Sequence, residues 1–165
     1  MAQDAVTLIL EDHRTFQRYF RELKSTQGDS TECARLLDQI GPLLLAHHRA
    51  EEEKVYPLIS RRAPEEQPEV GHVCAEHAEA ERLFDLLRQA DPASLDFARL
   101  RDDFVDTVQR HFEEEESQLL TILDEVAGEQ TRAELGRAFW DRRQEELRRI
   151  RTLGLTGSEL APVPG

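Results

Sequence analysis

The sequence predicts an all-α protein, an up-down-up-down four-helix bundle with one additional C-terminal helix. Apolar residues recur at spacings of three and four along most of the chain, and no stretch alternates as a strand would. Glycine and proline gather at a few points that separate long helical stretches. With 165 residues the chain can bury a core of its own without disulfides. We therefore predict a bundle over residues 1–128, a helix over 129–153 packed on it, and a flexible tail over 154–165.

The first two helices are predicted on either side of a break at Gly28-Asp29-Ser30. The first runs from about 4 to 24. Ser30 or Thr31 can cap the second, which runs from about 31 to 62. Pro42 and Pro57 lie inside that second span, and each removes one helical hydrogen bond. A bend or an interruption is therefore expected at either proline.

Three more helices follow a loop over residues 63–68 that contains two prolines. The third runs from about 69 to 89 and ends at the turn 91–94. The fourth continues to Val126, just before Gly128. The fifth covers about 130–153, with Trp140 as its expected anchor on the bundle. Its exposed side, dense in arginine and glutamate, could equally form a dimer surface, so the expected assembly is a monomer or a homodimer.

Charge and cysteine content narrow the classes of partner and compartment. The formal net charge is −13 and the pI is near 4.9, which argues against direct binding to nucleic acid or to an anionic membrane. Cys33 and Cys74 form no metal-binding or disulfide pattern, and free thiols are typical of a reducing cytoplasm. No segment has the length of a membrane span, and the first residues lack the pattern of a secretion signal.

An internal repeat is the most informative feature of the chain. His13 and His47 lie 34 residues apart, His77 and His111 lie 34 apart, and the second pair follows the first by 64 residues. Flanking residues repeat as well, because an acid precedes the first histidine of each pair and a glutamate follows the second by four positions. Such self-similarity indicates a duplicated supersecondary unit. Because imidazoles and carboxylates are the shared residues, the repeat predicts a metal site between the two copies.

Helical geometry predicts which of these side chains point inward. Residues four apart share a helix face, so His47 with Glu51 presents one nitrogen and one carboxylate on the apolar side, and His111 with Glu115 does the same. His48 and Glu52 are rotated by about 100° from that pair and are expected at the surface. The other glutamates of the runs 51–53 and 113–116 are expected to be solvated, as is His72.

The predicted ligand set indicates the metal. Buried carboxylates are costly without a partner, and lysine and arginine are expected on the outer faces. Histidine and carboxylate without thiolate disfavour a structural zinc site, and they do not suit calcium. Six or seven ligands, with two carboxylates placed to bridge, suit two metal ions, most naturally iron.

The spaced elements His13, His47-His48-Arg49-Ala50-Glu51 and Glu76-His77, then His111 with Glu115, resemble the hemerythrin-like (HHE cation-binding) domain over roughly residues 5–127. That family is a four-helix bundle with an oxo- or hydroxo-bridged pair of non-haem iron ions. The resemblance implies terminal ligands and bridging carboxylates at particular positions. The terminal ligands are His13, His47, His77 and His111, and the bridges are Glu51 and Glu115.

One position departs from the oxygen-carrying members, which have a further histidine four residues after the one that matches His77. Here that residue is Glu81, and its counterpart in the first repeat is Gln17. Glu81 is predicted as a seventh ligand, with the alternative that it accepts a hydrogen bond from His77 and orients it. If Glu81 binds, the iron held by His13 and His47 keeps an open position for dioxygen, peroxide or nitric oxide.

Three functions follow from such a site. The first is a di-iron protein that binds dioxygen or a related small ligand as a carrier or sensor. The second is an enzyme with catalase-like or peroxidase-like activity, or one that reduces nitric oxide. The third is iron storage or sensing, with folding coupled to metal occupancy. The sequence leaves open whether the protein is an enzyme.

Overall fold

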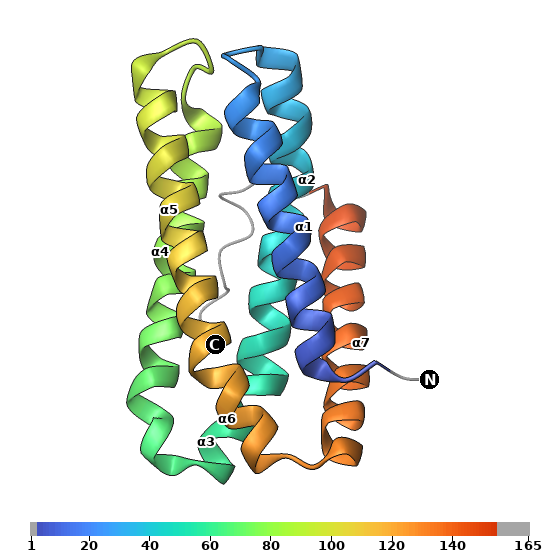
Figure 1. Cartoon of the computed structure of the whole chain (residues 1–165). Helices are drawn as coiled ribbons and strands as arrows, with labels where there is room; N and C mark the ends of the chain where they lie inside the picture. Colours follow the sequence, from blue (N-terminus) through green and yellow to red (C-terminus); the bar gives the residue numbers. More distant parts are fainter. Residues whose placement is uncertain (1–2, 155–165) are drawn as a thin grey trace.

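The computed structural model describes residues 3–154, in which helices account for all regular structure. Four long helices form an antiparallel bundle (Figure 1), which confirms the predicted fold class. They are α1 (Ala5–Ser25), α2 (Ser30–Ala50), α4 (Gln67–Gln89) and α5 (Leu95–Ser117). The short helices α3 (Tyr56–Arg62) and α6 (Leu119–Val126) lie at one end of it, and α7 (Glu129–Leu153) follows.

Side-chain caps begin three of the long helices. Asp4, Asp29 and Ser94 each accept a hydrogen bond from the backbone N–H three residues later, at 3.0 Å in every case. Such caps satisfy amides that have no partner inside the helix. The connection after α3 contains a single 3₁₀ turn, η2 (Pro64–Glu66), and Pro68 lies in the first turn of α4, where its missing N–H is not needed.

The second predicted helix is interrupted by a π-helical turn, η1 (Glu51–Val55), between α2 and α3. Pro42 lies inside α2 without ending it, whereas Pro57 lies in the first turn of α3, two residues after the π turn. Pro57 has no N–H to offer the carbonyl of Glu53, and its ring would crowd that carbonyl in a regular helix. The wider turn relieves this conflict. It also pairs the N–H of Tyr56 with the carbonyl of Glu51, which places these two residues one above the other.

The fourth predicted helix is also divided, at Gln118, where the backbone angles (φ −117°, ψ −76°) are distorted from those of a regular helix. The hydroxyl of Thr121 donates to the carbonyls of Glu116 and Ser117 at 3.4 and 3.3 Å. A side chain that competes for helix carbonyls favours such a break. The result is α5 followed by α6, instead of one continuous helix to Val126.

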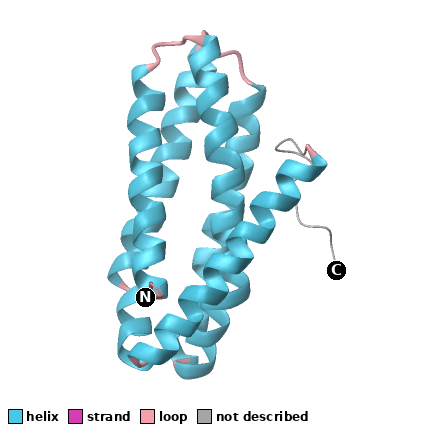
Figure 2. Cartoon of the chain, turned by 90° about the vertical axis from the view of Figure 1, so that its right-hand side faces the viewer, coloured by secondary structure: helices cyan, strands magenta, loops and turns pink. Residues whose placement is uncertain are grey.

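Helix α7 lies along the outside of α1 and α2 (Figures 1 and 2). Its anchor is Phe139, which is completely buried, and the expectation for Trp140 is wrong because that side chain is 45% exposed. Gly136 lies against the backbone at Gln3 and Ala5, where a Cβ atom would find no room. Helix α7 ends at Gly154, which adopts a left-handed conformation (φ +60°). The rest of the predicted tail lies outside the described residues.

Two apolar clusters fill the bundle, and a polar layer separates them. One cluster joins the last turns of α1 and α4 to the first turns of α2 and α5, with Phe20, Leu36 and Phe104 among its members. The other lies toward α3 and α6, with Ile9 and Ile59 among its members. The predicted metal ligands occupy the layer between the clusters, which restricts the access of water to it. None of the described helices is long and apolar enough to cross a membrane.

Candidate metal centre

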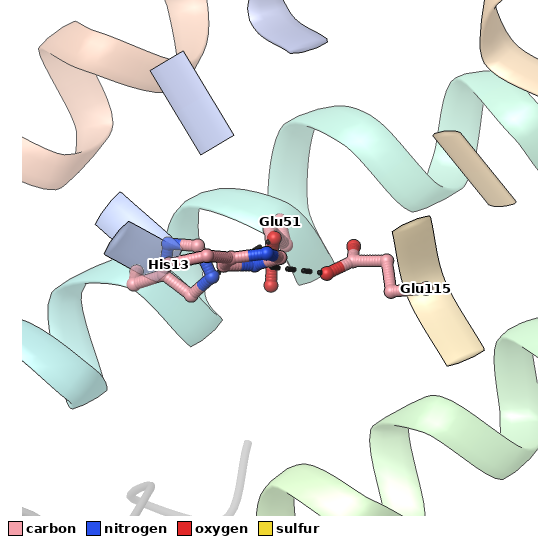
Figure 3. A group of neighbouring side chains, drawn as sticks. His13, Glu51 and Glu115 are labelled. Atoms are coloured by element: carbon pink, nitrogen blue, oxygen red, sulfur yellow. Dashed lines mark ion pairs between the residues drawn. The ribbon is translucent and has the colours of Figure 1, made fainter. Parts of the chain in front are cut away.

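Six predicted ligands converge in the polar layer, and each is at most 2% exposed. They come from all four long helices and from the π turn: His13, His47, Glu51, His77, His111 and Glu115. Their inward donor atoms form two groups, in each of which every atom lies within 4.8 Å of the others. Figure 3 shows His13, Glu51 and Glu115 of the first group facing one another, and His47 completes that group.

Glu51 belongs to both groups, because its two oxygens face different histidines. Oε1 lies 3.1 Å from Nε2 of His47, and Oε2 lies 3.4 Å from Nε2 of His77. Nε2 of His77 is in turn 3.0 Å from Nε2 of His111. Glu115 likewise lies between the halves, with Oε2 at 3.3 Å from His13 and 3.8 Å from His111. Two carboxylates between two sets of imidazoles are what a pair of bridged cations would require.

The donor set has unmet polar groups that a cation would satisfy. Nε2 of His13, Nε2 of His47, Oε1 of Glu51 and Oε2 of Glu115 are buried and make no hydrogen bond. Buried polar atoms without a partner are rare in folded proteins and costly. Their presence in one cluster of imidazoles and carboxylates shows that these residues fit a metal.

Every inward histidine is held by a carboxylate at its other ring nitrogen. Nδ1 of His13 pairs with Glu116 at 2.7 Å, and Nδ1 of His77 pairs with Glu52 at 2.9 Å. In the same way Asp12 holds His47 and Glu76 holds His111, both at 3.1 Å. Metal-binding histidines typically have such acceptors, which fix the ring and leave Nε2 free for the metal.

These contacts correct two expectations drawn from helical geometry. Glu52 and Glu116, expected to be solvated, are 28% and 39% exposed and orient two of the ligand histidines. His48, expected at the surface, is completely buried, because the side of α2 that it occupies is covered by α4. Its ring stacks on His77 with 3.7 Å between centroids and 7° between planes. His72 is 54% exposed, as expected.

Glu81 lies outside both donor groups. Its Oε1 pairs with Nδ1 of His48 at 2.9 Å, and its Oε2 accepts from Arg49 at 3.1 Å. It therefore orients a histidine, but that histidine is His48, whereas Glu52 takes the predicted role at His77. The geometry of the described residues gives no support to Glu81 as a seventh ligand. Glu81 of α4 thus pairs with His48 of α2, and Glu52 of the π turn pairs with His77 of α4. The sequence does not predict these pairs, because they depend on which helices face each other in the folded bundle.

The charges of the cluster shift its proton equilibria strongly. Burial alone would raise the pKa of Glu115, but the close pairing with Nε2 of His13 at 3.3 Å and the nearby imidazoles lower it to about 2. Burial alone would lower the pKa of His47, but the charge of Glu51 and the hydrogen bond to Asp12 raise it to about 10. Protons on imidazole therefore balance the buried carboxylates when no metal is bound. Metal binding would displace them.

Tyr56 and Phe112 complete the walls of the site. Because of the π turn, the hydroxyl of Tyr56 reaches the cluster, where it donates to Glu115 at 2.9 Å and lies 3.3 Å from Glu51. Burial and both carboxylates raise the pKa of Tyr56 well above its ordinary value, so it remains a donor. Phe112 stacks on His13 with 3.8 Å between centroids.

Helix α7 is connected to the site through charged side chains. Arg143 donates two hydrogen bonds to Asp12, to Oδ2 at 2.8 Å and to Oδ1 at 2.7 Å, and Oδ2 also pairs with Nδ1 of His47. Arg142 pairs with Glu53 of the π turn at 2.7 Å. The expectation that arginine stays on outer faces is therefore wrong for Arg143, since its guanidinium group reaches the carboxylate that holds His47. The additional helix supports the site as well as the fold.

A helical bundle with buried imidazoles and carboxylates at its centre defines a class of cation-binding proteins. The chain belongs to one family of that class, the hemerythrin HHE cation binding domain, whose model matches residues 4–123. A hemerythrin HHE cation binding domain-containing protein from Mycobacterium kansasii has a similar structure, with a TM-score of 0.81 and 21% identity. That match covers 94% of this chain and 96% of the other, and it supports the fold.

A curated relative from Nostoc sp., described as a DNA nickase, is 28% identical over 130 residues. The matched region is 78% of this chain but only 35% of the relative. The chain thus spans about a third of that protein, and the activity in its name belongs to the longer protein.

Proposed function

We propose that this protein binds two non-haem iron ions in the buried cluster and that a small ligand, dioxygen, peroxide or nitric oxide, binds to one of them. The observation that carries the proposal is the pair of donor groups that share Glu51. One ion would be held by His13 and His47 and the other by His77 and His111, with Glu51 shared between them and Glu115 nearer the first ion. An oxo or hydroxo bridge would complete the pair.

The chemistry of the donors supports iron. Imidazole and carboxylate without thiolate suit iron in either oxidation state, and Cys33 and Cys74 belong to neither donor group. Bound iron would supply the redox chemistry and the affinity for small oxygen ligands that the side chains lack. The apolar clusters above and below exclude water from the polar layer, and Tyr56 holds Glu115 in place.

We propose that the open position lies in the other half of the site from the one expected from the sequence. The first group offers four donors and the second offers three, because Glu115 lies nearer His13 than His111 and Glu81 is turned away from both. The ion held by His77 and His111 would therefore have fewer protein ligands and would be the one that accepts a small molecule. This differs from the expectation based on ligation by Glu81.

Metal analysis and one spectrum test the proposal. Protein expressed with sufficient iron should contain close to two iron atoms per chain, and His47→Ala should lower that count, whereas His72→Ala, at the exposed histidine, should not. A value near one, or a preference for zinc, would overturn the di-iron assignment.

Mixing the reduced protein with dioxygen separates the functional alternatives. A reversible absorption band supports a carrier or sensor, and irreversible oxidation supports an enzyme or a storage protein. Oxygen release from added peroxide would then identify a catalase-like enzyme.

A further inference from the structure

His48 is a buried histidine that the metal site does not use. It is completely buried, and its Nδ1 pairs with Glu81, which Arg49 holds in turn. Because a carboxylate only accepts hydrogen bonds, Nδ1 carries the proton of the neutral ring. Nε2 then keeps its lone pair, and this atom has no hydrogen-bond partner in the described structure. Nε2 of His48 is therefore a hydrogen-bond acceptor held in a fixed position, and none of the described residues donates a hydrogen bond to it.

Stacking argues against a role for His48 as a further metal ligand. An imidazole binds an ion in the plane of its ring, and the rings of His48 and His77 are parallel with 3.7 Å between centroids. Two rings in this arrangement cannot direct their nitrogens at one ion. In agreement, Nε2 of His48 belongs to neither group of donor atoms.

The position of His48 coincides with the half of the site that has fewer donors. Its ring covers His77, and it lies edge-on to His111 with 6.3 Å between centroids. These two histidines and Glu51 form the three-donor group. The ring that carries the unused acceptor thus packs against the histidines of the ion at which an open position is expected.

We propose that Nε2 of His48 accepts a hydrogen bond from the small ligand bound on the His77 and His111 side. This inference rests on the proposed function and specifies the ligand class. An acceptor favours a ligand that carries a proton, such as hydrogen peroxide, hydroxide or water. It offers nothing to a ligand without one, such as azide or nitric oxide.

The test uses His48→Phe, which keeps an aromatic ring for the stack on His77 and removes Nε2, with His72→Phe as the matched control. Three quantities are measured for each iron-loaded protein: iron per chain, azide affinity, and hydrogen peroxide affinity from the initial change in iron absorption after rapid mixing. A neutral hydrogen bond corresponds to about a fivefold change in affinity. We expect His48→Phe to keep its iron, to bind azide within about twofold of the parent and to bind hydrogen peroxide about fivefold more weakly.

Each other outcome overturns the inference. Unchanged peroxide binding would show that Nε2 does not contact the ligand, and loss of iron would make His48 a ligand or a structural support. Equal weakening of azide and peroxide would indicate a steric effect. If the parent itself lacked two irons or bound neither probe, the proposed function would fail instead.

A second variant covers a failure of His48→Phe to fold. Glu81→Leu keeps His48 but removes the acceptor that fixes its proton on Nδ1. We expect it to reduce the preference for hydrogen peroxide over azide while the iron content stays at that of the parent. An unchanged preference would overturn the inference in the same way.

Discussion

Arg143 offers a direct test of whether the additional helix supports the metal centre. Its guanidinium and the carboxylate of Asp12 are 12% and 9% exposed, so solvent screens this pair little. Removing one partner of a buried ion pair costs about 3 to 5 kcal/mol. Asp12 would retain its hydrogen bond to His47, so Arg143→Met should cost about 3 kcal/mol, near the low end of that range. For a chain of this size the expected drop in melting temperature is about 6 to 12 °C.

Thermal unfolding followed by circular dichroism checks this value in metal-free protein, with Arg148→Met as the control. Arg148 is exposed on the same helix and makes no ion pair in the described structure. With iron present, Arg143→Met should also retain the metal less well, since Asp12 orients the ligand His47. If the two variants melted within about 1 °C of each other, the argument that α7 acts through Asp12 would be refuted.

Three further predictions concern acid stability, Glu81 and close packing. The pKa of Glu115 is lowered to about 2, so its contribution to metal-free stability is complete above pH 4.5 and is lost as the pH falls toward 2. Denaturant titrations at several pH values should show this loss, and Glu115→Gln should make it smaller. Glu81→Gln should keep the iron content of the parent, whereas Glu51→Gln should lower it in the same metal analysis. Gly136→Ala should lower the melting temperature, because its Cβ would strike the backbone near Gln3. Gly71→Ala meets open space and should raise the melting temperature, because alanine has a better helix propensity than glycine. The opposite order of melting temperatures would contradict the packing of α7.

Local periodicity predicts much of this molecule because helices and shared helix faces are short-range properties. The spacing of His47 and Glu51 places both on one face in any α-helix, and the duplicated register brings the four repeated histidines to one level of a bundle. Burial of these side chains beside each other confirms that part of the prediction. The fold class and the convergence of six side chains could therefore be predicted from the sequence.

Contacts between helices decided the rest. His48 faces outward on an isolated helix, but α4 covers that side of α2 and buries it against His77. Glu52 pairs with His77, and Glu81 pairs with His48. These pairs depend on the relative positions of two segments, and neither segment's own sequence specifies those positions. The π turn is a different case, because it follows from Pro57 itself and escapes only a prediction that assumes a regular helical period over the whole segment. The sequence thus determined which side chains share a helix face, because a face is a property of a single helix. Tertiary packing determined which partners these side chains contact, because the partners come from other helices.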